Sequence, residues 1–225
     1  MPRTILCYGD SNTWGYIPSR SDNYQPASRY KRHERWTGIL QVLLNSKYLI
    51  VEEGLNSRTT HIDYFHMPDR NGKTYLPSCL YSHAPIDLVI LALGGNDAKS
   101  YFNSTPEDIT AGMGDLINII QSSSYGPEMS TSPRVLIITP PIPLPVAEEC
   151  VDENGVLFFN GGIEKIKKLP LLFEKLANEK TCEFLNLAED IRPSSVDGIH
   201  YEKEAHRKFA VRVEEKTKLI FGDRY

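Results

Sequence analysis

The sequence predicts an α/β protein built around a parallel β-sheet, and two observations support this fold class. Five short segments rich in β-forming residues are spread along the chain, at residues 4–8, 48–51, 87–93, 134–139 and 182–187. The middle ones are continuously apolar, which is typical of strands covered on both faces. Helical segments separate the strands, and such an alternation is typical of a parallel sheet.

Helices are expected over residues 36–44, from residue 104 onward, over 162–179 and over 202–221. The second has a clear start, because Thr105 can cap it and Pro106 suits its first turn. The two acidic residues that follow favour the positive end of the helix dipole. Within residues 162–179, Pro170 predicts a break or kink, because proline lacks a backbone donor and clashes with the preceding turn.

Composition limits the classes of protein that this chain can represent. Its 225 residues contain no linker-like stretch, so we expect a single domain over residues 1–225. The formal net charge of −4 provides no positive field for nucleic acid. There is no apolar run of membrane-spanning length, no signal-peptide pattern, and no paired cysteine spacing. We therefore expect a cytoplasmic protein that binds neither nucleic acid nor a membrane.

Two long loops are expected at one end of the sheet. Residues 16–35 follow the turn after the first strand, and residues 140–161 are rich in Pro, Glu and Gly. In an open parallel sheet, ligands bind at the carboxyl ends of the strands. Both loops leave from that end, so we expect them to form the walls of a pocket.

A serine lies in the turn after the first strand, where residues 9–15 read GDSNTWG. Backbone N–H groups and the start of a helix can face negative charge that develops at Ser11. Gly-Asp-Ser is also a common turn sequence followed by a helix cap. By itself, this stretch is compatible with either a nucleophile or a turn residue.

A matching base lies near the other end of the chain, where residues 196–200 read VDGIH. Serine is a poor nucleophile at neutral pH and needs an imidazole base, which in turn needs a carboxylate to orient it. Asp197, three residues before His200, can supply that carboxylate. The alternative for this stretch alone is a surface turn with a capping histidine.

Two further stretches can supply hydrogen-bond donors to an oxyanion. Residues 93–97 read LGGND, in which Asn96 can aim its side-chain N–H at a ligand. Residues 53–60 follow the second strand and can contribute a backbone N–H. All four stretches follow predicted strands or precede the last helix, so the fold can bring them together.

Taken together, these stretches resemble the SGNH (GDSL-type) hydrolase family, whose four sequence blocks match in order across nearly the whole chain. Within that family, the chain is most similar to small bacterial arylesterases with acyltransferase and perhydrolase activity, on residues 5–11, 36–38, 52–60, 75–80 and 197–200. The resemblance implies a flavodoxin-like three-layer α/β/α sandwich with five parallel strands in the order 2-1-3-4-5. It also implies a homo-oligomer and no metal or organic cofactor.

The resemblance also implies a role for each matching residue. Ser11 is the expected nucleophile, His200 the base and then the acid, and Asp197 the residue that orients it. The oxyanion would be held by the backbone N–H groups of Ser11 and Ser57 and by the side chain of Asn96. The expected partner is a small-molecule ester with a short acyl or an aryl group, and Asn96 and Trp14 are the candidate substrate-binding residues.

Two positions depart from the family pattern. Asn12 replaces the leucine of the GDSL motif, and Ser57 stands where the second block usually has glycine. Both departures bear on substrate scope more than on catalysis. Alternative functions within the family are a carbohydrate O-deacetylase and a lysophospholipase, and a flavodoxin-like binding protein without turnover is an alternative from another class.

Three neighbouring polar residues raise the question of a metal site. His61, Asp63 and His66 are close together in the sequence, but no further ligand on a fixed element accompanies them. Structural zinc requires four ligands and catalytic zinc three. We therefore expect no metal at this position.

Overall fold

A computed structural model describes residues 2–19, 27–65, 67–151 and 155–222 of the chain. Five strands form one sheet: β1 (Arg3–Gly9), β2 (Tyr48–Gly54), β3 (Leu88–Ala92), β4 (Arg134–Ile138) and β5 (Glu183–Leu185). All neighbours pair in parallel, in the order β2-β1-β3-β4-β5. This confirms the predicted fold class and strand order.

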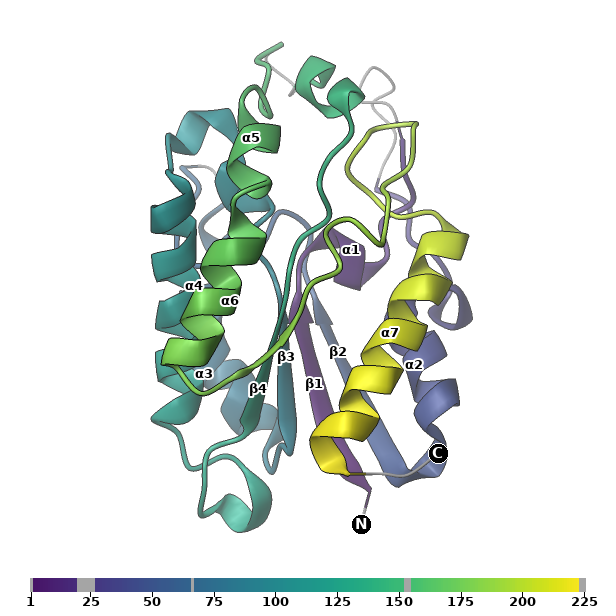
Figure 1. The fold of residues 1–225 in the computed structure, drawn as a ribbon, viewed down its shortest axis with the longest axis vertical. Helices are drawn as coiled ribbons and strands as arrows, with labels where there is room; N and C mark the ends of the chain where they lie inside the picture. Colours follow the sequence, from purple (N-terminus) through teal and green to yellow (C-terminus); the bar gives the residue numbers. More distant parts are fainter. Residues whose placement is uncertain (1, 20–26, 66, 152–154, 223–225) are drawn as a thin grey trace.

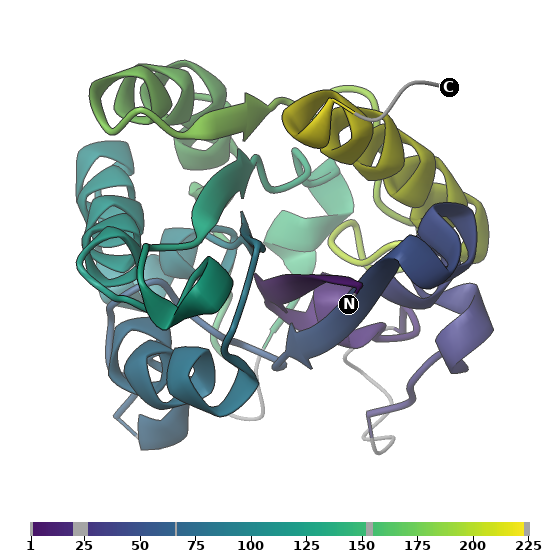
Figure 2. The same ribbon diagram turned by 90° about the horizontal axis from the view of Figure 1, so that it is seen from below.

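Helices cover both faces of the sheet (Figures 1 and 2). On one face lie α2 (Trp36–Leu44) and α7 (Lys203–Phe221), and on the other lie α3 (Gly72–His83), α4 (Pro106–Gln121) and α6 (Leu169–Glu179). Two shorter helices, α1 (Ser11–Trp14) and α5 (Gly162–Ile166), lie toward the carboxyl ends of the strands. Among the described residues, no helix combines the length and apolarity needed to cross a membrane.

Short 3₁₀ helices complete the described elements. They span Arg32–Glu34, Asn45–Lys47, Pro68–Arg70, Asn96–Ala98, Ser100–Phe102, Pro127–Met129 and Pro145–Glu149.

The central strand β1 shows why the apolar runs are continuous. Ile5 and Cys7 pack under α2 and α7, whereas Leu6 and Tyr8 pack under the opposite helices, and all four are 0% exposed. Because side chains alternate between the faces of a strand, both sets need apolar residues when both faces are covered.

The predicted α4 start is confirmed in detail. Pro106 begins the helix, and the Thr105 side chain accepts a hydrogen bond from the Asp108 N–H while Asp108 binds back to the Thr105 N–H. This reciprocal pair is a capping box. The predicted break in the segment 162–179 is confirmed, since α5 ends at Ile166 and α6 begins at Leu169. Pro170 lies in the first turn of α6, where its missing N–H has no cost.

Helix α3 was not predicted, because Pro77 lies inside it. Its start is marked by Asn71, whose side chain accepts hydrogen bonds from the N–H groups of Lys73 and Thr74. This cap satisfies two of the first-turn donors that the helix itself leaves without partners.

Candidate active site

The residues after β1 form a single helical turn that begins at Ser11. Asp10 caps this turn, and its carboxylate accepts a hydrogen bond from the Asn12 N–H at 2.9 Å. A Cβ atom at Gly9 would lie 2.0 Å from the Thr13 side chain, so only glycine fits there. The N–H groups at the start of a helix have no partners within it, so the Ser11 N–H is available to a ligand.

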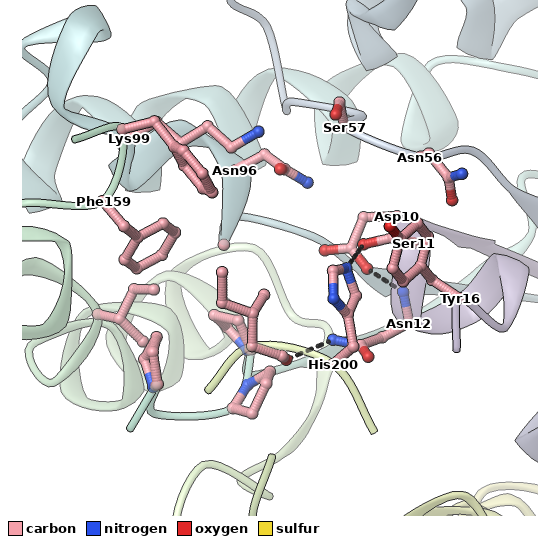
Figure 3. Close-up of a pocket in the computed structure, with 17 residues that line it drawn as sticks. Asp10, Ser11, Asn12, Tyr16, Asn56, Ser57, Asn96, Lys99, Phe159 and His200 are labelled. Atoms are coloured by element: carbon pink, nitrogen blue, oxygen red, sulfur yellow. Dashed lines mark hydrogen bonds between the residues drawn. The ribbon is translucent and has the colours of Figure 1, made fainter. Parts of the chain in front are cut away.

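Ser11 is joined to the loop before α7 by a hydrogen bond to His200 (Figure 3), and His200 is in turn hydrogen-bonded to Asp197. The Ser11 hydroxyl lies 2.9 Å from His200 Nε2, and His200 Nδ1 lies 2.8 Å from a carboxylate oxygen of Asp197. The fold thus brings together three residues predicted from stretches at opposite ends of the chain.

Backbone groups of the same loop hold the Asp197 carboxylate in place beside the imidazole. Its second oxygen accepts hydrogen bonds from the backbone N–H groups of Ile199 and His200, both at 2.9 Å. Burial opposes ionisation of this carboxyl, but the side-chain hydrogen bond and charge of His200 and the two backbone hydrogen bonds together outweigh it, so the pKa of Asp197 lies below its usual value. The ring of Tyr16 stacks on the imidazole, with centroids 4.3 Å apart.

Asn12, which replaces the leucine of the family motif, links the serine turn to the histidine loop. Its side-chain amide donates to the Ile199 carbonyl at 3.3 Å and accepts from the Tyr201 N–H at 3.0 Å. These two backbone groups flank His200 in the chain. Asn12 therefore holds the loop on both sides of the imidazole.

The expected oxyanion donors lie along the same pocket as Ser11. Ser57 and Asn96 both line it, and the Asn96 amide donates to the Arg58 carbonyl at 3.1 Å, which leaves its other N–H for a ligand. Ser57 has a φ of +63°, the left-handed region that glycine favours. Glycine, which the family pattern leads us to expect at this position, would adopt this conformation without strain.

Two buried carboxyl groups, those of Asp97 and Asp10, stabilise the turns that carry these donors by accepting hydrogen bonds. Asp97 accepts hydrogen bonds from the Thr60 N–H and hydroxyl, and burial nevertheless raises its pKa. Asp10 is also buried, and desolvation outweighs the hydrogen bond from the Asn12 N–H, which raises the pKa of Asp10 to about 6.

The pocket has a volume of about 210 Å³ and one largely apolar wall. The predicted loop 140–161 contributes much of that wall, and residues from α5 and the histidine loop complete it: Pro140, Pro141, Pro143, Phe158, Phe159, Ile166 and Ile199. Tyr16 represents the other predicted loop, of which residues 20–26 lie outside the described residues.

The candidate substrate-binding residue Trp14 is not among the residues that line this pocket. Its ring packs under the Arg29 guanidinium, whose carbon lies 4.9 Å from the ring centroid. Conversely, the pocket contains Lys99, which sequence reasoning missed. The one sequence signal for it is its position three residues after Asn96, one helical turn further along.

Two of the three residues considered as metal ligands have separate hydrogen-bond partners. The His61 ring pairs with Asp115 at 3.2 Å, Asp63 accepts from the Asn71 amide at 2.9 Å, and His66 lies outside the described residues.

One other group of possible ligands lies away from the pocket. The side chains of Glu53, Cys79 and His83 have ligand atoms within 4.8 Å of one another. The hydrogen bond between His83 and Glu53, at 2.8 Å, accounts for the approach of two of these side chains.

Comparison with known proteins agrees with this geometry. The GDSL-like Lipase/Acylhydrolase family matches residues 7–208. The aryl esterase of M. smegmatis is 36% identical, with a TM-score of 0.87 over 96% of this chain and 99% of that one. A carbohydrate acetylesterase from Sinorhizobium meliloti is 38% identical, with a TM-score of 0.88 over 97% of this chain and 100% of that one. A search of curated proteins found no match. This chain therefore belongs to the GDSL-like lipase/acylhydrolase family and is a carboxylic ester hydrolase.

Proposed function

We propose that the protein hydrolyses small carboxylic esters through an acyl-enzyme formed on Ser11. The observation that carries this proposal is the hydrogen-bonded chain from Ser11 through His200 to Asp197, with distances of 2.9 and 2.8 Å. Such a chain supplies the base that a serine hydroxyl needs and the carboxylate that orients the base.

In the first half of the reaction, the Ser11 oxygen attacks the ester carbonyl carbon while His200 Nε2 accepts the hydroxyl proton. Asp197 stabilises the imidazolium that results. The carbonyl oxygen becomes an oxyanion, held by the N–H groups of Ser11 and Ser57 and by the Asn96 amide. In known cases one such donor contributes about 10²- to 10³-fold to the rate.

In the second half, the tetrahedral intermediate collapses and the alcohol leaves with the proton from His200. The neutral imidazole then accepts a proton from water, whose oxygen attacks the acyl carbon. The second intermediate releases the acid and returns the proton to Ser11. An alcohol or a peroxide can replace water in this step, so the same site supports acyl transfer and perhydrolysis.

The size of the pocket favours a short acyl group. Its volume of about 210 Å³ lies below the roughly 300 Å³ at which sites for larger organic ligands begin. An adjoining groove shares Tyr16, Ser57, Lys99 and Phe158 with the pocket, and it offers space for a larger alcohol or aryl group. The pocket alone does not offer the room that the long acyl chain of a lysophospholipid needs.

A carbohydrate O-deacetylase is the second candidate, and Asn56 favours it. The side-chain oxygen of Asn56 is buried, has no hydrogen-bond partner among the described residues, and belongs to a residue that lines the pocket. A sugar hydroxyl can donate to such an acceptor. The similarity to the Sinorhizobium meliloti acetylesterase supports the same candidate.

The first experiment is hydrolysis of p-nitrophenyl esters from acetyl to octanoyl, without added metal, by the wild type and by Ser11→Ala. We expect a preference for short chains and a loss of about 10⁴-fold or more in the folded variant. An inactive wild type, or a Ser11→Ala variant that keeps its rate, would contradict the proposal. Faster turnover of acetylated sugars than of aryl acetates would select the deacetylase.

A further inference from the structure

Lys99 has no role in the proposed hydrolysis, yet it lies in the pocket where hydrolysis would occur. Its N–H donates to the Asn96 carbonyl at 3.2 Å, so the turn that presents the oxyanion donor also fixes the base of this side chain. Lys99 lines both the pocket and the adjoining groove. In Figure 3, the Lys99 and Asn96 side chains extend into the pocket from one side, and His200 and Ser11 lie on the other.

The Lys99 ammonium is held between aromatic rings. It donates to the Tyr64 hydroxyl at 3.0 Å, and it lies 5.4 Å from the centroids of both the Tyr64 and Phe158 rings. Tyr64 is itself only 3% exposed, so the position of its hydroxyl is fixed by packing. Ser57, from the second predicted oxyanion loop, lines the same groove as Tyr64 and Lys99.

The charge of Lys99 is not paired within the described part of the chain. No carboxylate there forms an ion pair with it, and Asp10 and Asp97 act on it only at longer range. Desolvation lowers the pKa of Lys99 to about 8, so the amine is mostly protonated at neutral pH. An ammonium has three donors, and Tyr64 takes one. A desolvated cation of this kind gains most from an anionic ligand.

We propose that Lys99, oriented by Tyr64, binds a carboxylate on the substrate. The enzyme would then prefer esters that carry one carboxylate over neutral esters. This inference rests on the proposed esterase function and narrows its substrate class. The carboxylate can belong to the acyl chain or to the alcohol, because the lysine lies where the pocket and the groove meet.

Matched substrate pairs test the two positions separately. The acyl pair is p-nitrophenyl hemisuccinate and p-nitrophenyl butyrate, and the alcohol pair is 4-carboxyphenyl acetate and 4-methylphenyl acetate. For each pair, the ratio of kcat/KM for the anionic ester to that for the neutral ester is measured at pH 7. Comparing this ratio between enzyme variants removes the difference in intrinsic reactivity between the two esters.

Lys99→Met keeps the length of the side chain without its charge, and Lys99→Arg keeps the charge. We expect Lys99→Met to lower the ratio by about 10- to 100-fold for at least one pair, the range typical of hydrogen bonds to charged groups. Lys99→Arg should recover part of it. An unchanged ratio for both pairs in Lys99→Met would overturn the proposal, even if both neutral esters are hydrolysed.

A pH profile separates charge recognition from a merely structural role. In the wild type, the ratio should fall between pH 7 and 9 as Lys99 loses its proton, whereas the ratio of Lys99→Met should stay flat. Other titratable groups near Lys99 are Asp10 and Asp97, and Asp63, Tyr16, Tyr64 and Tyr101 line the groove that it shares. Burial raises the pKa of the Tyr64 phenol well above this range. His200 acts in the proposed hydrolysis of both esters, so its effect on the two rates cancels in the ratio.

A binding measurement makes the test independent of turnover. Calorimetry compares the binding of p-nitrophenyl hemisuccinate and 4-carboxyphenyl acetate to Ser11→Ala and to Ser11→Ala/Lys99→Met. Weaker binding of at least one anion to the double variant would support the proposal, and equal binding of both would overturn it. If the wild type hydrolyses no ester, the proposed function fails, while this measurement still decides whether Lys99 binds a carboxylate.

Discussion

Replacing Asn12 by leucine, the residue of the family motif, tests whether this side chain positions His200, the proposed catalytic base. The substitution removes the acceptor for the Tyr201 N–H, at 3.0 Å, and the donor to the Ile199 carbonyl, at 3.3 Å. The first of these bonds is buried, and a buried donor without a partner costs roughly 1–3 kcal/mol. For a chain of this length, about 1 kcal/mol corresponds to roughly 2–4 °C in Tm.

We therefore expect Asn12→Leu to lose about 1–3 kcal/mol in the free energy of unfolding and about 10- to 100-fold in kcat, because small displacements of a base have effects of that order. KM should change less than kcat. The assays are urea unfolding and hydrolysis of p-nitrophenyl acetate. Asn12→Ala is the comparison variant, since it removes the same two hydrogen bonds without adding a leucine side chain.

If Asn12→Leu had the wild-type Tm and kcat, the two hydrogen bonds would not be what holds the histidine loop. A loss of stability with unchanged kcat would mean that the bonds support the loop but do not set the position of the imidazole. Only a loss of both stability and kcat supports a positioning role for Asn12.

Three further predictions concern the second oxyanion loop, the buried Asp10 and the assembly. Ser57→Gly should keep kcat within about 3-fold, because its expected donor is a backbone N–H, whereas the β-branched Ser57→Val should lose at least about 10-fold, since it disfavours the φ of +63°. Asp10 has a folded-state pKa of about 6, above the unfolded value, so the stability it contributes is present below about pH 4 and is lost as the pH rises through 6. Relative to the wild type, Asp10→Asn should accordingly gain about 2–3 kcal/mol between pH 4 and 8 in urea titrations. Light scattering should give a mass above that of one chain, and a monomer at micromolar concentration would contradict the expected homo-oligomer.

Much of the fold could be predicted because the local signals agree with the tertiary structure. The apolar runs of β1 and β3 match strands buried on both faces, and the capping box at Thr105 specifies the start of α4 by contacts within one turn. Helix α3 lacked such agreement, because Pro77 opposes a helix locally and packing against the sheet overrides it.

The candidate site could be predicted where a residue's role depends on its own turn. Ser11 follows a strand directly, and Asp197 reaches His200 across three residues, so short stretches contain the signal. Trp14 belongs to the same stretch as Ser11, but its ring packs against the guanidinium of Arg29, which comes from a segment without a motif. The direction of a side chain depends on such distant partners, and a motif does not encode them.

Lys99 is the converse case, because it lies in the pocket although no motif predicted it. Its place in the pocket is set by Tyr64, from a loop without regular structure, and by Phe158, from a second loop that follows Lys99 by about sixty residues. No spacing rule connects these three residues, because the sheet and not the local chain brings their segments together. Catalytic groups that act through neighbours in sequence are therefore visible as motifs. Lys99, which we propose selects the substrate, is positioned by residues from separate loops, so its role becomes visible only once the fold is known.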